Sequence, residues 1–168
     1  MATEQTTTGQ GSGVELREID PQPVLSIRAT IPTAQLGEAM GDRIAALRGY
    51  LQQSGIQPAG PPFVRYHTFE ATETDMEMGV PVAEPVAGEG RIAAGELPGG
   101  PAAATLHTGA HEKLGEAYGR IAEWVQEHGR EPSGPAREVY YWIDLSQDQD
   151  PSTGDPSSWR TELIQPIK

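Results

Sequence analysis

Two long stretches of the chain carry apolar side chains at helical spacing. Residues 33–55 begin with Thr33, a residue type that caps helices, and end at Gly55, a residue type that terminates them. The second stretch follows His111 and ends at Gly129. The apolar positions on one face are Leu36, Met40, Ile44, Leu47 and Leu51 in the first stretch, and Leu114, Tyr118, Ile121 and Val125 in the second. The pattern predicts two amphipathic helices.

Shorter stretches are typical of strands. "VLSIRAT" (24–30) is rich in β-branched residues, and "DPQP" separates it from the earlier "VELREI". "FVRYHTF" (63–69) and "DMEMGVPV" (75–82) alternate around the polar "EATET", which predicts a hairpin. In "REVYYWID" (137–144), Glu138, Tyr140 and Trp142 project from the same face of the predicted strand. That face is either solvated or lines a pocket that combines apolar surface with a negative charge.

The chain also contains an internal repeat. "LGEA" occurs at 36–39 and at 114–117, an offset of 78 residues. "SGIQPAGPPFVRYH" (54–67) resembles "EHGREPSGPAREVYY" (127–141) at an offset of 74, which aligns Tyr66 with Tyr140. "MEMGVPV" (76–82) resembles "TELIQPI" (161–167) at an offset of 85, which aligns Glu77 with Glu162; the polar segment "SQDQDPSTGDPSS" supplies the extra length. Three matched blocks in the same order indicate a duplicated unit.

The repeat and the elements together predict an α+β fold of two pseudo-symmetric β-α-β-β units, about 14–83 and about 91–168, after a disordered tail at 1–13. We expect one antiparallel sheet with both helices on one face and a central ligand groove. Pseudo-symmetry would place Tyr66 opposite Tyr140, and Glu77 opposite Glu162, across that groove.

Composition narrows the range of partners. A net charge of −12 argues against nucleic acid or an anionic membrane surface as the direct partner, because both require clustered Lys and Arg. The chain has no Cys, no signal peptide and no apolar run long enough for a bilayer, which favours a cytoplasmic location. "GEG" and "PGG" lack the spacing of a nucleotide loop, so we expect no cofactor.

The two units resemble the GyrI-like family, the effector-binding domains of AraC-type and multidrug-responsive regulators. The resemblance covers residues 14–168 and is most specific at Glu138 and Tyr140 and at the terminal "TELIQPI". It implies a pocket for planar, often cationic, lipophilic molecules, with Glu138 inside it and Glu162 as a second pocket acid. Because only a short tail precedes the first unit, we expect a free-standing member without a helix-turn-helix.

The candidate site residues compete with simpler interpretations. Glu138 is otherwise an exposed acid on an edge strand, and Tyr140 and Trp142 are otherwise core aromatics. Weaker candidates for the ligand site are Phe63, Tyr66, His67 and Glu162. His107 and His111 are four residues apart, but "TGA" between them lacks the Glu of a zinc hydrolase helix, so we expect no metal site.

Two functions from different classes fit this sequence. The first is binding of lipophilic or cationic small molecules, including toxins, by stacking and one carboxylate. The alternative is an enzyme that opens cyclopropane-bearing genotoxins with water, with Glu138 as general base. Some free-standing members of the family are understood to do this. A protein partner bound away from the groove is a third interpretation, which no sequence feature supports.

Overall fold

The computed structural model describes residues 13–109, 114–143, 145 and 159–168. These residues divide into two compact units. Unit A contains residues 21–98 together with 143 and 145, and unit B contains the described residues of 1–20, 99–142 and 152–168. The predicted tail and the "SQDQDPSTGDPSS" segment lie outside the described residues, except for Gly13.

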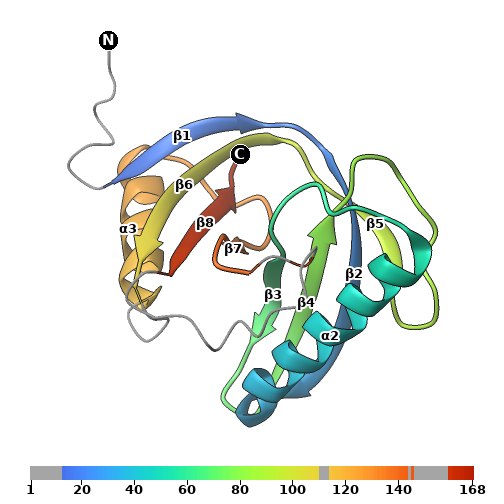
Figure 1. Ribbon diagram of the computed structural model, residues 1–168. Coiled ribbons are helices and arrows are strands. Elements are labelled where there is room, and N and C mark those ends of the chain that lie inside the picture. Colours follow the sequence, from blue (N-terminus) through green and yellow to red (C-terminus); the bar gives the residue numbers. More distant parts are fainter. Residues whose placement is uncertain (1–12, 110–113, 144, 146–158) are drawn as a thin grey trace. The chain divides into compact units, whose positions relative to one another are not determined.

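Unit A has five elements after its first strand β2 (Gln22–Pro32). They are the 3₁₀ turn η1 (Thr33–Gln35), helix α2 (Leu36–Ser54) and strands β3 (Phe63–Phe69), β4 (Glu73–Pro81) and β5 (Ala93–Leu97). The strand order is β3-β4-β2-β5, and every pairing is antiparallel. Helix α2 packs against β2 and β4 (Figure 1).

Unit B repeats this plan. Strand β6 (Gly100–Thr108) is followed by helix α3 (Leu114–Glu127) and strands β7 (Arg137–Tyr140) and β8 (Arg160–Pro166), and β1 (Val14–Ile19) joins them. The order is β1-β6-β8-β7, again antiparallel throughout. Helix α3 packs against β6, β1 and β8. In the part of the chain that the structure describes, two helices and eight strands with antiparallel pairing confirm the α+β class.

The sequence offsets also relate the pairing registers of the two units. Offsets of 78, 74 and 85 residues carry the pairs of unit A onto pairs of unit B. The matched pairs are Leu25–Val80 with Ala103–Gln165, Phe63–Gly79 with Arg137–Ile164, and Pro58–Val82 with Pro132–Ile167. The repeat therefore extends from sequence to strand register, and superposition of the two units stays a prediction.

The outer strands exchange between the repeats. β1 precedes β2 in the chain but pairs with β6 of unit B, and β5 precedes β6 but pairs with β2 of unit A. Unit boundaries drawn in chain order, at 14–83 and 91–168, therefore differ from the contact-based units at both strands. The sequence prediction did not include β5, whose "AAGEL" has little β-branched or aromatic character.

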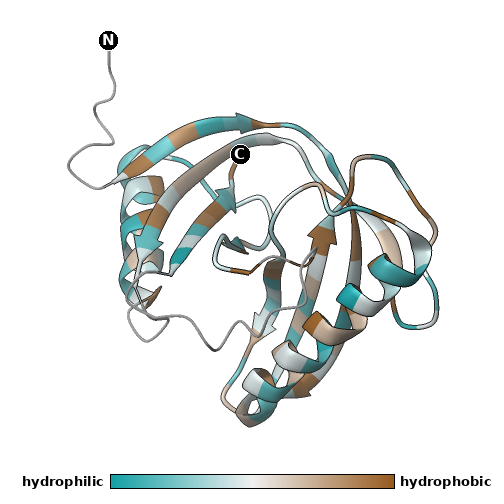
Figure 2. Ribbon diagram, in the orientation of Figure 1, coloured by the Kyte–Doolittle hydropathy of each residue, from teal (hydrophilic) through white to brown (hydrophobic). Residues whose placement is uncertain are grey.

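The strands of unit B place apolar side chains on the face that α3 covers. In unit B, Ala103 of β6 and Leu163 of β8 pack with Ile121, Trp124 and Val125 of α3. The opposite face carries a smaller cluster of Ala102, Ala104 and Ile164. Figure 2 shows hydrophobic and hydrophilic positions alternating along the strands.

Two local predictions were wrong. Thr33 does not cap α2, because its hydroxyl donates to the carbonyl of Glu70 at 2.6 Å and the helix begins only at Leu36. The strand at 137–144 ends at Tyr140, and Trp142 lies in the turn that follows. Gly55 terminates α2 in the left-handed conformation as expected, with φ of 68°. In the described part of the chain, no helix has the length and apolar character needed to cross a membrane.

Candidate functional site

Strand β7 directs Glu138 and Tyr140 toward the face of unit B that α3 covers. Glu138 pairs with Leu163, which belongs to the core under α3, and Tyr140 pairs with Thr161 two positions away. Directly paired residues of antiparallel strands share a face. The side chains of Glu138 and Tyr140 therefore project together, as the sequence predicts.

The carboxylate of Glu138 is held by two phenols. The hydroxyl of Tyr118, on α3, donates to Oε2 at 2.5 Å, and the hydroxyl of Tyr140 donates to Oε1 at 2.6 Å. Glu138 is only 4% exposed, whereas Tyr118 is 36% exposed. Sequence reasoning assigned Tyr118 to the apolar stripe of its helix, and helical spacing alone does not reveal that its hydroxyl reaches β7.

Glu138 has no positively charged partner among the residues that the structure describes. Burial disfavours its ionised form, while the hydrogen bonds from Tyr118 and Tyr140 favour it. Burial is the larger effect, so the pKa of Glu138 is raised above its ordinary value. The site combines a strongly desolvated carboxyl group with two neutral donors.

Aromatic rings continue from Tyr140. The ring of Trp142 lies 5.6 Å from that of Tyr140, tilted by 55°, and stacks on Trp159 at 3.9 Å with an interplanar angle of 6°. The indole N–H of Trp142 donates to Oγ1 of Thr161 at 3.4 Å, which ties the turn back to β8. Sequence reasoning missed Trp159, because the polar segment before it breaks the alignment of the repeat.

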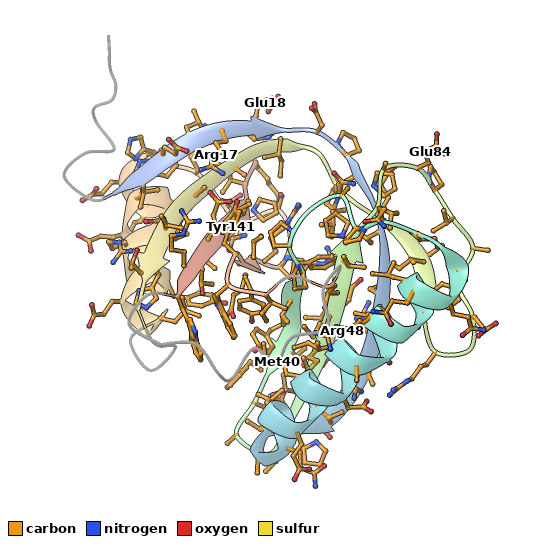
Figure 3. The ribbon with its side chains drawn as sticks, viewed as in Figure 1. Arg17, Glu18, Met40, Arg48, Glu84 and Tyr141 are labelled. Atoms are coloured by element: carbon orange, nitrogen blue, oxygen red, sulfur yellow. The ribbon has the colours of Figure 1, made fainter. Side chains whose placement is uncertain are left out.

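Glu162 lies on the opposite face of the same sheet. It pairs with Val139, whose side chain points away from Glu138. Its Oε2 is 2.6 Å from the Arg17 guanidinium, and its Oε1 accepts a hydrogen bond from the Tyr141 hydroxyl at 2.9 Å. Figure 3 labels Arg17 on β1 and Tyr141 in the turn after β7. The structure therefore does not bring Glu162 together with Glu138.

The three candidates on β3 have different surroundings in unit A. Phe63 is 2% exposed and packs over Gly79, where an added Cβ would lie 2.8 Å from Cζ of the ring. Tyr66 is half-buried, pairs with Met76 and meets the Phe69 ring edge-on at 5.4 Å. The offset of 74 that aligns Tyr66 with Tyr140 places Val64 at the position of Glu138. Unit A has no carboxylate at that point.

His67 belongs to an ion-pair cluster around Glu77. Oε1 of Glu77 contacts Arg65 at 2.7 Å and His67 at 2.8 Å, and Oε2 accepts from the Ser26 hydroxyl at 2.7 Å. Burial opposes ionisation of Glu77, but the bonds from His67, Ser26 and Arg65 outweigh it and lower its pKa. Glu77 thus has a cationic partner, Arg65, of a kind that Glu138 lacks among the described residues.

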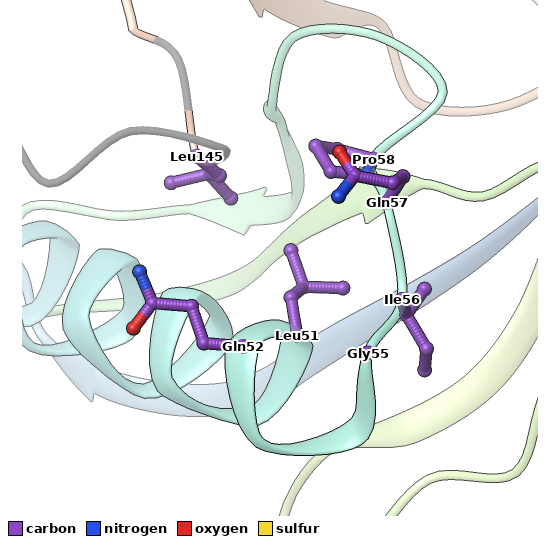
Figure 4. A pocket seen from close by; sticks show the side chains of 7 residues that line it. All are labelled: Leu51, Gln52, Gly55, Ile56, Gln57, Pro58 and Leu145. Atoms are coloured by element: carbon purple, nitrogen blue, oxygen red, sulfur yellow. The ribbon is translucent and has the colours of Figure 1, made fainter.

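A small pocket lies elsewhere in unit A, at the C-terminal end of α2. Its volume is about 100 Å³, and Leu51, Gln52, Pro58 and Leu145 are among its lining residues (Figure 4). Pockets for drug-sized molecules are several times larger, roughly 300–1,000 Å³. None of the seven candidate residues lines it.

Metal-ligating residues do not gather in the part of the chain that the structure covers, where no group of three or more His, Asp or Glu side chains is suited to a metal ion. His107 is buried within β6, and His111 lies outside the described residues.

The two buried acids predict opposite responses of stability to pH. The pKa of Glu138 is raised in the folded state, so its carboxyl group contributes most to folding stability at pH values below the ordinary carboxyl pKa. That contribution is lost as the pH rises through the raised pKa. At neutral pH, Glu138→Gln should therefore be at least as stable as the parent. In acid, the variant should be as stable as the parent or less stable. Urea unfolding across pH measures this difference.

Glu77→Gln is the matched variant for this comparison. In the parent, the lowered pKa of Glu77 means that its carboxylate stabilises the fold at pH values above the ordinary carboxyl pKa and that this stabilisation is lost in acid. Glu77→Gln should therefore lower the free energy of unfolding by roughly 1–3 kcal/mol at neutral pH, and by less at low pH. A Glu138→Gln protein that is destabilised at neutral pH as much as Glu77→Gln would show that Glu138 serves the fold as an ionised group.

Several proteins of known structure share the fold of this chain. The C-terminal domain of EcmrR has the same fold, with a TM-score of 0.75 and 24% identity over 92% of this chain and 96% of that domain. The chain spans 57% of EcmrR in its DNA complex. SAV2435 bound to tetraphenylphosphonium matches with a TM-score of 0.60 and 14% identity over 92% of this chain and 93% of SAV2435.

A hydrolase from Listeria innocua also shares the fold, with a TM-score of 0.64 and 10% identity over 94% of this chain and 92% of the hydrolase. No curated protein sequence matches the chain. A profile for the GyrI-like small molecule binding domain matches residues 13–168. The chain therefore belongs to the GyrI-like family of small-molecule binding domains.

Proposed function

We propose that this chain binds planar, lipophilic cations, with Glu138 as the counter-charge and Tyr140, Trp142 and Trp159 as the ring surface. One observation carries the proposal. Of the three buried glutamates in the described residues, Glu77 and Glu162 have cationic partners, and Glu138 has only phenols. A bound cation would supply the charge that the fold leaves out.

The magnitudes support binding of moderate strength. At about 4 Å and an effective dielectric constant near 20, a cation and a carboxylate attract by roughly 4 kcal/mol before desolvation is subtracted. Contact of the cation with an indole or phenol face adds on the order of 1 kcal/mol. Ring burial supplies most of the rest, which favours micromolar affinity, roughly −8 kcal/mol. Because stacking requires no fixed polar pattern, the site should accept many ring systems.

The shared fold gives a further reason to choose this ligand class. SAV2435 was solved with tetraphenylphosphonium, a lipophilic cation, on a fold that covers most of this chain. At 14% identity the fold alone is comparable, so the argument for this chain rests on the surroundings of Glu138.

Tetraphenylphosphonium and tetraphenylborate provide a test, because they have nearly the same size and opposite charge. The parent protein should bind the phosphonium with micromolar Kd in calorimetry near neutral pH, and the borate at least about tenfold more weakly. Glu138→Gln should weaken phosphonium binding by roughly 1–3 kcal/mol. Glu162→Gln is the control, because it removes a carboxylate from the opposite face and should leave both affinities unchanged.

Equal affinity for the two ions in the parent would refute charge selection at this site. Loss of phosphonium binding in Glu162→Gln with full binding in Glu138→Gln would move the counter-charge to the other face of the sheet.

A second candidate function is hydrolysis of a strained ring, and the raised pKa of Glu138 favours it. A carboxyl group whose pKa lies closer to neutral is a better general base than an ordinary one. Hydrolases from Listeria innocua share the fold at 10% and 12% identity. Water would add to a cyclopropane conjugated to a carbonyl.

In this reaction the water oxygen bonds to the ring CH₂ carbon while Glu138 takes a proton from the water. The ring C–C bond breaks, and its electron pair passes into the conjugated carbonyl; the carbonyl oxygen takes a proton from solvent, and Glu138 releases its proton to solvent. The product contains one additional water and no other change. Tyr140 and Trp142 would hold the planar part of the substrate.

Incubation with a cyclopropane-bearing DNA alkylator, followed by mass analysis, tests this candidate. A product heavier by one water, formed about 100-fold more slowly by Glu138→Gln, is the expected result. Binding of the alkylator without any such product above the rate in buffer would exclude hydrolysis and leave the binding function in place.

A further inference from the structure

Both oxygens of the Glu138 carboxylate are already engaged. Tyr140 donates to Oε1 at 2.6 Å and Tyr118 donates to Oε2 at 2.5 Å, from a strand and a helix on the same side of the sheet. Because Glu138 is only 4% exposed, a bulky donor group on a ligand has limited access to the accepting positions that remain. The negative charge remains, and the two phenols occupy about half of the roughly four positions at which a carboxylate can accept hydrogen bonds.

This arrangement treats two kinds of cation differently. A protonated amine is strongly hydrated and requires acceptors for its N–H groups when it leaves water. A quaternary ammonium, a phosphonium or a delocalised ring cation has no N–H donor, and its weakly hydrated charge can rest against aromatic faces. Near Glu138 the ring of Tyr140 is fully buried, while the stacked rings of Trp142 and Trp159 are partly exposed and can meet such a cation.

From this geometry we infer that the site selects cations without N–H donors over protonated amines that carry the same ring system. The inference rests on the proposed cation-binding function and names its ligand class more closely. Tyr118 and Tyr140 are the specificity-determining residues, because their hydroxyls take the positions that an ammonium group would use.

The test uses two naphthalene probes that are both cationic near neutral pH. One is naphthylmethylammonium, and the other is its trimethylammonium counterpart. Three added methyl groups favour the quaternary probe by apolar contact in any variant, so the measured quantity is the ratio of the two Kd values. A change in the ionised fraction of Glu138 alters both Kd values alike and cancels from the ratio.

Tyr118→Phe should reduce the preference for the quaternary probe by about tenfold, because Oε2 becomes available to an N–H donor. At 36% exposure, Tyr118 can lose its hydroxyl without disturbing the core. Tyr140→Phe should change the ratio in the same direction through Oε1. Tyr141→Phe is the control, since its hydroxyl serves Glu162 on the other face, and its ratio should equal that of the parent.

The outcomes separate this inference from the proposed function. If the parent binds tetraphenylphosphonium and both probes, but the ratio is the same in Tyr118→Phe and Tyr140→Phe as in the parent, cation binding stands and selection by the phenols is overturned. If the parent binds no cation at all, the proposed function fails and this inference fails with it. A ratio that also changes in Tyr141→Phe would overturn the assignment to the Glu138 face.

Discussion

The candidate site in unit B is built around a carboxylate, that of Glu138, which is buried beside two phenols and has no cationic partner among the described residues. Taking an anion out of water is unfavourable, and neutral hydrogen-bond donors offset only part of that free energy. The part of the desolvation free energy that is not offset raises the pKa of Glu138. A fold that needed this position only for packing would be served by an apolar residue, as unit A is by Val64. This unfavourable charge is the reason that we propose a ligand at Glu138.

The fold produces this arrangement through a short strand, β7, and a helix, α3, that lies over the same face of unit B. β7 ends at Tyr140, so Glu138 and Tyr140 are fixed by the ladder to β8 while Trp142 is released into a turn. Helix α3 packs its apolar stripe on β6 and β8, and this brings Tyr118 over Glu138. Trp159, just before β8, then stacks on Trp142. Rigid elements thus hold the acid, and side chains at their ends provide the ring surface.

Much of the fold could be predicted from the sequence, because the turn and cap residues of the two repeats occur at matching positions. Gly55 and Gly129, and the prolines near the strand ends, fix equivalent backbone geometry in both halves, so the offsets predicted equivalent strand pairing. The pairing of β1 with unit B and of β5 with unit A could not be predicted from the sequence. Both strands precede a short proline-containing connection, and nothing in their composition tells which neighbour they join.

The site was accessible only in part. Alternation along β7 correctly grouped Glu138 with Tyr140, since period two holds for as long as the strand continues. Glu162 was a candidate through the family resemblance and the repeat, and it lies on the opposite face from Glu138, because alignment with Glu77 relates positions in two units and does not imply a common face with Glu138. Tyr118 and Trp159 depend on contacts between elements far apart in sequence, which no local pattern records.

The central claim concerns the ionisation of one group, so a direct titration of Glu138 tests it best. Carbon-13 labelling of the glutamate side-chain carboxyl groups, with Glu138→Gln to assign the signal, allows its pKa to be followed by NMR with and without saturating tetraphenylphosphonium. A cation that pairs with the ionised form must lower the pKa, by linkage between binding and ionisation. The account predicts a raised pKa in the free protein that falls when the phosphonium binds. An unchanged pKa with bound phosphonium would contradict it.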